Sequence, residues 1–321
     1  MAKYSSLTKG QDEALVNRLG DAFGGDGLAA VHAILAGAKV TIEEIIATFF
    51  DKHGRRIPPR GIKAAVCDAN YKFHLVQPET VDYAARIERV IDAFEGKVAF
   101  PEAAWFEDAI GGLKMKIEGD SKIVNALKGI HLPNVVPQMV ITNHGQTLDE
   151  VLLVALGRSY QKEFPEGRPF NNYCKGELVN QVRVLSESRL DLLVERAKQG
   201  PVPILEFPTA TQGFSVDAQR EQMETMLEGF ILNGFNAVLA MIMWPDVLAR
   251  DFNTPVIDLS AYQRQSAEYS LYLNPNDDNL NFDNRANLAD ANDNYSGGVS
   301  FVGLCLLCSC PGVFPEGKTP G

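Results

Sequence analysis

Residues 177–207, ELVNQVRVLSESRLDLLVERAKQGPVPILEF, carry the clearest architectural signal in the chain. The segment begins and ends with residues typical of strands, at 177–185 and 201–207. Between them a helix is expected over 189–198, with serines before it that can cap its first turn. Strand, helix and strand over this length are typical of a βαβ unit, in which a right-handed crossover joins two parallel strands. We therefore expect a partly parallel sheet here.

Helical and strand patterns extend to both sides of this unit. Pro137 places the strand expected at 135–142 at the edge of a sheet or at a strand end, because proline cannot donate to a β-ladder. The other expected strands are 269–273 and 299–307. The expected helices are 11–23, 27–36, 41–52, 80–94, 121–127, 147–160 and 245–248, one from Pro101, and one capped by Ser215 that reaches 228.

Together these patterns predict an α/β protein, or an α+β protein, with three regions. Residues 1–130 are expected to be mainly helical. Residues 131–310 are expected to form the α/β region, with C-terminal strands and an irregular insertion at 274–298, where Asn and Asp favour turns. Residues 311–321, rich in Pro and Gly, are expected to form a frayed tail.

The composition describes a globular chain with an acidic surface. It has 321 residues, of which 45% are hydrophobic, and a formal net charge of -11 at pH 7. This hydrophobic content supports a sizeable core. The negative charge disfavours nucleic-acid binding and binding to an anionic membrane surface, since both need a field of Lys and Arg. We expect neither partner and interpret the acidity as a source of solubility.

Two further features predict a soluble protein of the cytoplasm. The first ten residues are polar and do not resemble an export signal, and the longest apolar run, 299–310, is shorter than the roughly 20 residues of a membrane span. The chain has 5 cysteines, an odd number, which suits reduced thiols better than a framework of disulfides.

Residues 312–319 match the G-x-x-x-x-G-K-T pattern of a phosphate-binding P-loop. In such a loop the phosphates lie on the N-terminus of a helix that follows the pattern. Here Pro320 and Gly321 follow Thr319, and Pro315 removes an amide from the loop. We interpret the match as chance and expect no nucleotide or other cofactor.

Two groups of residues are candidate metal ligands. Cys305, Cys308 and Cys310 have the close spacing of a zinc site, although a fourth ligand is lacking nearby. Packing in the core as small apolar groups is the favoured interpretation, with zinc binding and redox chemistry as alternatives. The Asp-x-Asn-x-Asn runs at 277–281 and 290–294 resemble half of a calcium loop but lack its Gly and Glu. We interpret them as turns, with another kind of calcium site as the alternative.

The loop at 208–215, PTATQGFS, is the candidate ligand-binding loop. In α/β sheets, ligands bind where a strand ends and a helix begins, and this loop is expected at such a place. Its candidate residues are Thr209, Thr211, Gln212, Gly213 and Ser215, with Arg189 or Arg220 as counter-charge to an anionic ligand. The alternative is capping and turn chemistry alone, which uses the same residue types.

His144 is the best placed of the 5 histidines, at an expected strand end before a helix. It is a candidate general base, and the alternative is a structural histidine. Without an evident nucleophile or complete metal site, the function is not readable from the sequence. The favoured hypothesis is a non-catalytic binding or regulatory protein with a small polar ligand as its candidate partner; other partners are not readable from the sequence. The alternative is a hydrolase or transferase that acts on a polar or anionic small substrate at His144 and the 208–215 loop.

Overall fold

The computed structural model describes residues 9–23, 26–36, 48–69, 72–266 and 268–303. The chain divides into two units, Met1–Ala47 and Thr48–Gly321. Within the described ranges, no helix is both long enough and apolar enough to cross a membrane.

The first unit contains two helices, α1 (Lys9–Phe23) and α2 (Gly27–Leu35), which pack against each other. Asp26 caps α2, because its carboxylate accepts a hydrogen bond from the N–H of Ala29 at 3.0 Å. Both helices and the cap agree with the sequence, which confirms a helical N-terminal region. Of the expected helix 41–52, residues 41–47 lie outside the described residues, and residues 48–52 are not helical.

Two helices of the second unit begin at a side-chain cap close to the expected position, but the helix that was expected to reach 228 ends at Glu221. Asp82 caps α3 and Ser215 caps α8 through side-chain hydrogen bonds to the N–H groups of Ala85 and Ala218. A π-helical turn, Leu148–Leu152, joins α5 to α6. The helices are α3 (Tyr83–Ala93), α4 (Ala103–Glu118), α5 (His144–Thr147), α6 (Leu153–Glu163), α7 (Leu190–Ala197), α8 (Val216–Glu221), α9 (Phe235–Met243) and α10 (Pro245–Leu248).

The described strands form three sheets. The first has the order β1 (Leu132–Val136), β4 (Val202–Phe207), β11 (Val299–Phe301) and β5 (Phe230–Leu232), and all its pairs are antiparallel. The second has the order β10 (Tyr295–Ser296), β6 (Val256–Leu259), β8 (Ser270–Pro275), β9 (Leu280–Arg285) and β2 (Phe170–Asn172). The third pairs β3 (Val182–Val184) with β7 (Tyr262–Arg264).

This architecture confirms the α/β class with a partly parallel sheet, but the predicted βαβ unit is wrong. The parallel pairs are β10 with β6 and β2 with β9, in the second sheet. The two strands of the predicted unit, β3 and β4, lie in different sheets, and each pairs antiparallel with its neighbours. Helix α7 therefore connects two sheets. Spacing along the chain shows that a helix separates two strands, but not which distant strands will pair with them.

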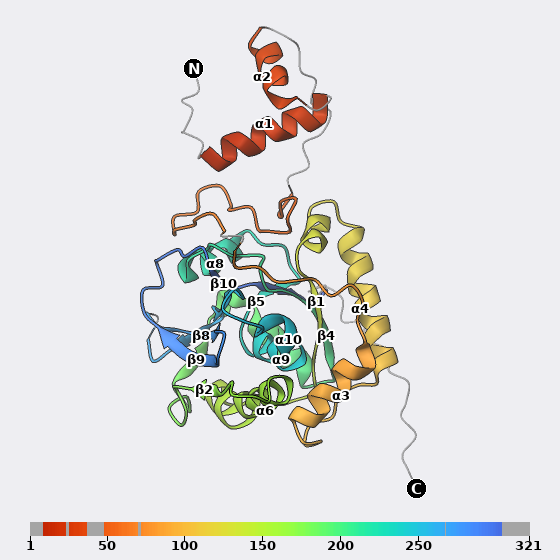
Figure 1. Cartoon of the computed structure of the whole chain (residues 1–321), viewed down its shortest axis with the longest axis vertical. Coiled ribbons are helices and arrows are strands. Elements are labelled where there is room, and N and C mark those ends of the chain that lie inside the picture. Colours follow the sequence, from red (N-terminus) through yellow and green to blue (C-terminus); the bar gives the residue numbers. More distant parts are fainter. Residues whose placement is uncertain (1–8, 24–25, 37–47, 70–71, 267, 304–321) are drawn as a thin grey trace. The chain divides into compact units, whose positions relative to one another are not determined.

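Helix α9 lies at the centre of the second unit, with β1 and β4 on one side and β8 and β9 on the other (Figure 1). It packs against β1, α3, α6 and β6, and every one of its residues is buried. A helix buried on all sides is apolar all round, so its sequence lacks the amphipathic pattern that reveals a surface helix. No helix was expected over 235–243 for this reason.

Two other expectations are corrected by the strand bounds. The strand expected at 135–142 is β1, which lies at the edge of its sheet as proline requires but ends at Val136. The segment 274–298 is not an irregular insertion, because β9 and β10 lie within it. In β9, Leu280 and Phe282 are fully buried while alternate residues carry polar side chains, so the Asn and Asp content masked a half-buried strand.

A buried polar network joins the first sheet to the start of α9. Glu206 on β4 is opposite Ser300 on β11, and its carboxylate accepts a hydrogen bond from the Ser300 hydroxyl at 2.5 Å. Asn134 on β1 and Asn236 on α9 donate to the other carboxylate oxygen, at 3.1 Å and 3.4 Å. Burial raises the pKa of Glu206 to about 7, and these three hydrogen bonds oppose the rise.

Candidate functional site

The predicted ligand loop, 208–215, does connect the end of a strand to the start of a helix. It leaves β4 at Phe207, and Ser215 accepts a hydrogen bond from the N–H of Ala218 at 3.1 Å as the cap of α8. Its other candidate residues are largely enclosed, since Thr211, Gln212 and Gly213 are buried and Thr209 is half-buried. The location was therefore predicted correctly, while ligand binding by these residues stays a prediction.

An extended segment of the same chain, residues 55–69, covers this loop and is called the covering segment here. The N–H of Cys67 donates to the carbonyl of Gly213 at 2.9 Å, and the N–H of Ser215 donates to the carbonyl of Ala65 at 3.0 Å. Gly213 has a φ of +88°, and a Cβ on it would lie 2.4 Å from the carbonyl oxygen of Cys67. Glycine is thus required for the covering segment to approach. The loop uses its backbone groups to hold this chain, in the way that a ligand site would hold a peptide.

The two arginines expected near the loop also hold backbone groups of the protein. The Arg189 guanidinium donates to the carbonyls of Met223, Met226, Leu227 and Phe230. The Arg220 guanidinium donates to the carbonyls of Ser260 and Tyr262, at 3.0 Å and 2.8 Å. These contacts give both cations a structural role in fixing the connections after α8 and β6.

His144 begins α5 and pairs with a buried tyrosine. Its Nδ1 lies 3.0 Å from the hydroxyl of Tyr262, and its ring also packs against Phe235. Burial lowers the pKa of His144 and the carboxylate of Asp191 raises it, so the neutral ring is favoured. Among the described residues, no hydrogen bond or ring contact joins His144 to the 208–215 loop. No such interaction links the two halves of the predicted catalytic site, and catalysis by them stays a prediction.

The candidate metal ligands lie partly outside the described residues. Cys305, Cys308 and Cys310 lie outside the described residues, as do residues 312–319. Within the described part of the chain, no group of three or more His, Cys, Asp or Glu side chains is arranged to hold a metal ion. In the second Asp-x-Asn-x-Asn run, the Asn292 side chain accepts from the N–H of Asn294 at 3.4 Å, which is the local hydrogen bond of a turn.

A groove that the sequence did not predict brings together acidic, basic, aromatic and imidazole side chains. Its volume is about 640 Å³. One wall is the extended segment 77–83, which leads into α3, and the other is the exposed side of α4. The groove is lined by Gln77, Pro78, Glu79, Thr80, Val81, Tyr83, Glu107, Lys114 and His131.

One end of the groove is basic. The side chain of Gln77 pairs with the backbone of His131, accepting from its N–H at 2.8 Å and donating to its carbonyl at 3.2 Å. The Nδ1 of His131 lies 2.9 Å from the carbonyl of Gly129, so it carries the proton of the neutral ring and donates it there. Burial lowers the pKa of His131, the Gly129 bond raises it, and the nearby ammonium of Lys114 lowers it. The positive charge of this end therefore comes from Lys114. Nε2 of the neutral His131 ring can accept a hydrogen bond.

The opposite end is acidic. Tyr83, the first residue of α3, lies edge-on to Phe106 of α4, with ring centroids 5.4 Å apart. Burial and the neighbouring carboxylate of Glu107 raise the pKa of the Tyr83 hydroxyl, which stays protonated at neutral pH. Among the described residues, neither Tyr83, Glu107 nor Lys114 has a hydrogen bond or an ion pair to another side chain. Their polar groups are available to a ligand.

Two glycines on α4 lie along the helix between the charged ends of the groove. Gly111 lies one turn after Glu107 and one turn before Lys114, so all three share one side of the helix. A Cβ added at Gly111 or Gly112 would meet no atom within 4 Å. Close packing therefore does not require these glycines, although each lowers helix stability relative to alanine. At Gly111 the missing side chain leaves bare backbone between the two charged ends.

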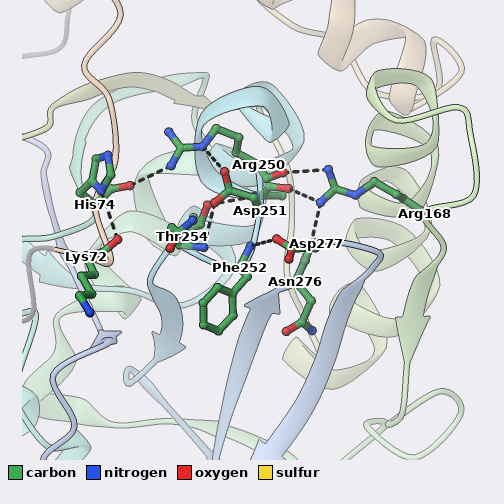
Figure 2. Close-up of polar contacts among 11 residues, drawn as sticks. Lys72, His74, Arg168, Arg250, Asp251, Phe252, Thr254, Asn276 and Asp277 are labelled. Atoms are coloured by element: carbon green, nitrogen blue, oxygen red, sulfur yellow. Dashed lines mark hydrogen bonds and ion pairs between the residues drawn. The ribbon is translucent and has the colours of Figure 1, made fainter.

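The wall 77–83 is fixed by contacts on the residues before it (Figure 2). The N–H of His74 donates to the carbonyl of Asn253 at 2.9 Å, and the Arg250 guanidinium donates to the carbonyl of His74 at 3.3 Å. The loop that carries Arg250 is held in turn by Arg168, which donates to the carbonyls of Arg250 and Asn276 at 2.8 Å each. The polar residues of Figure 2 thus secure the groove wall.

A second anchor holds α3, where the wall ends. The guanidinium of Arg86 makes two hydrogen bonds to the carboxylate of Asp246, at 2.6 Å and 2.7 Å, and lies 3.8 Å from the ring centroid of Trp244. It also donates to the carbonyl of Met243 at 3.0 Å, at the end of the buried helix α9. Such a paired and stacked guanidinium fixes orientation well, so Tyr83 is held by a rigid part of the core.

Sequence reasoning missed this groove because its residues come from three separate segments and match no motif. The one signal was the Gly111–Gly112 pair inside an otherwise helical pattern, between Glu107 and Lys114. Glycine within a helix indicates a packing or functional reason for its presence.

Comparisons of the chain with protein-family models, with curated proteins and with solved structures found no match. The geometry of the groove is therefore the basis on which a function is proposed.

Proposed function

We propose that this protein is a non-catalytic binding or regulatory protein that takes a small polar ligand in the groove between residues 77–83 and α4. The observation that carries the proposal is the convergence of Tyr83, Glu107 and Lys114, which are unpaired among the described residues, on one groove. At the other candidate places, several side chains already bind groups of the protein itself, namely those of His144, Arg189, Gln212, Ser215 and Arg220. Ligand sites combine a concave surface with a few convergent polar groups, as this groove does.

A cytoplasmic location is part of the proposal. The two described cysteines, Cys67 and Cys174, are both free thiols, which suits a reducing compartment. The acidic net charge of -11 supports a small-molecule ligand over a nucleic acid.

A hydrolase or transferase remains the alternative proposal. His144 with the 208–215 loop is the less favoured place for it, because Tyr262 contacts the His144 ring and the covering segment binds backbone groups of the loop. Within the groove, His131 is better suited to act as a base, since its Nδ1 proton is held by Gly129 and its Nε2 has no hydrogen-bond partner among the described residues. Chemical conversion of the bound ligand would indicate an enzyme, and recovery of the unchanged ligand would indicate a binding protein.

The test is NMR titration of the full chain with a panel of small polar molecules, namely amino acids, short peptides, simple amines, carboxylic acids and sugars. We expect at least one class to shift the ring resonances of His131 to saturation and to be recovered unchanged. Gly111→Leu should abolish this shift by placing a side chain in the groove, whereas Gly112→Leu, the matched control on another side of α4, should retain it. Binding that survives Gly111→Leu, or no binding by any class, would overturn the proposal, and chemical conversion of the ligand would favour the enzyme.

A further inference from the structure

The two ends of the groove carry opposite charges, and this polarity restricts the ligand. Lys114 supplies a cation at the end closed by Gln77 and His131, and Glu107 supplies an anion at the end formed by Tyr83. Glu79, which is exposed and also lines the groove, adds a second carboxylate. A purely anionic ligand would meet these carboxylates, and a purely cationic one would meet Lys114. A ligand that carries both charges complements both ends.

The spacing of the charged residues restricts the length of the ligand. Glu107 and Lys114 are two turns apart on α4, which is about 10 Å along the helix axis. An extended peptide spans roughly 3.3–3.6 Å for each residue, so two or three residues bridge this distance. The ammonium and carboxylate of a single α-amino acid lie on one carbon and reach only one end at a time.

The middle of the groove suits a main chain with little side-chain bulk. Gly111 offers only backbone between the two charges, and a Cβ there would meet no atom within 4 Å. Pro78 and Val81 on the opposite wall provide apolar contact on either side of the exposed Glu79.

From the polarity and length of the groove, we infer that its ligand is a short linear zwitterion, of the class that includes free peptides of two or three residues. The ammonium group lies at the end formed by Tyr83 and Glu107, and the carboxylate lies at Lys114. This inference rests on the proposed function, because it names the ligand of the same groove. It implies a protein that senses, carries or stores small products of peptide breakdown.

The test measures, by calorimetry, the binding of triglycine and of three analogues to the full chain. N-acetyltriglycine lacks the cation, triglycinamide lacks the anion, and glycine has both charges at too short a distance. We expect triglycine to bind at least about tenfold more tightly than each of these. The non-peptide zwitterion 8-aminooctanoate, which has as many chain atoms between its charges as triglycine, distinguishes the sources: equal affinity means that only charge and length are recognised, and weaker affinity means that the peptide groups contribute.

Charge variants assign the two ends. Glu107→Gln should lower the affinity for triglycine to that of N-acetyltriglycine and leave N-acetyltriglycine unaffected. Lys114→Met should lower the affinity for triglycine to that of triglycinamide and leave the affinity for triglycinamide unaffected. Asp108→Asn and Lys122→Met, which change exposed charges that do not line the groove, are the matched controls and should bind normally.

Failure of the inference is distinguishable from failure of the proposed function. If a simple amine, acid or sugar shifts His131 and is blocked by Gly111→Leu, while triglycine binds no better than its capped analogues, the groove is a binding site and the zwitterion inference is wrong. Glycine binding as tightly as triglycine would also overturn the inference. If no compound in either experiment binds at the groove, both are wrong.

Discussion

Gln77 pairs with His131 as a neighbouring strand would, because its side-chain amide satisfies both backbone groups of that residue. The Oε1 atom accepts from the His131 N–H at 2.8 Å, and Nε2 donates to the His131 carbonyl at 3.2 Å. One side chain thereby closes the basic end of the groove and joins its extended wall to the residue that precedes β1. The shape of the groove depends on this pair.

Replacing Gln77 with alanine should therefore loosen this end and lower stability. Two backbone groups of a half-buried residue lose their partners, so we expect the free energy of unfolding to fall by about 1–2 kcal/mol. Urea denaturation measures the change, and faster hydrogen exchange of the His131 amide should accompany it. Glu79→Ala, which removes an exposed neighbour without a hydrogen bond among the described residues, is the control and should change stability by less than about 0.5 kcal/mol.

Substitutions at the two glycines of α4, in contrast, should raise the free energy of unfolding. Gly111→Ala and Gly112→Ala should each raise the free energy of unfolding by about 0.5–1 kcal/mol, because alanine favours the helix and its Cβ would meet no atom within 4 Å. Denaturation curves of the two variants provide the measurement. A loss of stability in either variant would mean that α4 departs from regular helix at these positions.

Gly213 tests whether the covering segment is held as closely as its contacts indicate. Gly213 and Gly61 have similar φ values, +88° and +87°, but a Cβ at Gly61 would meet nothing within 4 Å. Gly61→Ala should therefore lower stability by about 1–2 kcal/mol through backbone strain alone. Gly213→Ala should lower it by roughly 1–3 kcal/mol more, because its Cβ would displace the backbone of Cys67.

The same displacement should expose the half-buried thiol of Cys67. Its reaction with a thiol reagent under native conditions should be faster in Gly213→Ala than in the unchanged protein and in Gly61→Ala. Equal rates and equal losses of stability in the two variants would show that the covering segment moves aside without cost, contrary to the contacts between Cys67 and Gly213.

The starts of α2 and α8 could be predicted from the sequence because their signals are local. Asp26 and Ser215 accept hydrogen bonds from residues three positions later, so a short stretch of sequence contains the whole interaction. Sheet partners could not be predicted, since β4 pairs with β1 and β11, whose residues are far away in the chain. Every extended strand offers the same backbone groups, and the partner is selected by tertiary packing.

In the candidate sites too, local features could be predicted and distant contacts could not. The 208–215 loop was found because strand, loop and helix are adjacent in sequence, but the covering segment that occupies it starts about 150 residues earlier, and no pattern links the two. In the groove, Tyr83, Glu107 and His131 are ordinary residues on separate elements. Only the fold gives them a common environment, so their proximity had no counterpart in the sequence.

The buried carboxyl of Glu206 should make stability depend on pH near neutrality. Burial raises its pKa to about 7 from an ordinary value of 4.5, so between these values the folded protein binds more protons than the unfolded chain. The free energy of unfolding contributed by this group is then highest below pH 4.5, falls as the pH rises to 7, and is constant above. The difference between the two pKa values of Glu206 corresponds to a loss of about 3 kcal/mol in the free energy of unfolding.

Glu206→Gln should remove this loss, because the amide resembles the protonated carboxyl. Its Nε2 can donate to the Ser300 hydroxyl, which in turn lies 3.5 Å from Oδ1 of Asn233, and its Oε1 can still accept from Asn134. The variant should therefore be more stable than the unchanged protein at pH 8, and equally stable at pH 4.5. The difference between their two pH profiles isolates Glu206.

That difference is needed because other groups also titrate in this range. Burial raises the pKa of Asp258, which adds a dependence of the same sign, and lowers the pKa values of His131 and His144, which adds the opposite sign below pH 6.5. These contributions are common to both proteins and cancel in the subtraction. Chemical denaturation between pH 4.5 and 8 supplies the profiles, with Glu228→Gln as an exposed control that should match the unchanged protein. Parallel profiles for Glu206→Gln and the unchanged protein would show that Glu206 is ionised in the fold, held by Ser300 and Asn134 strongly enough to offset its burial.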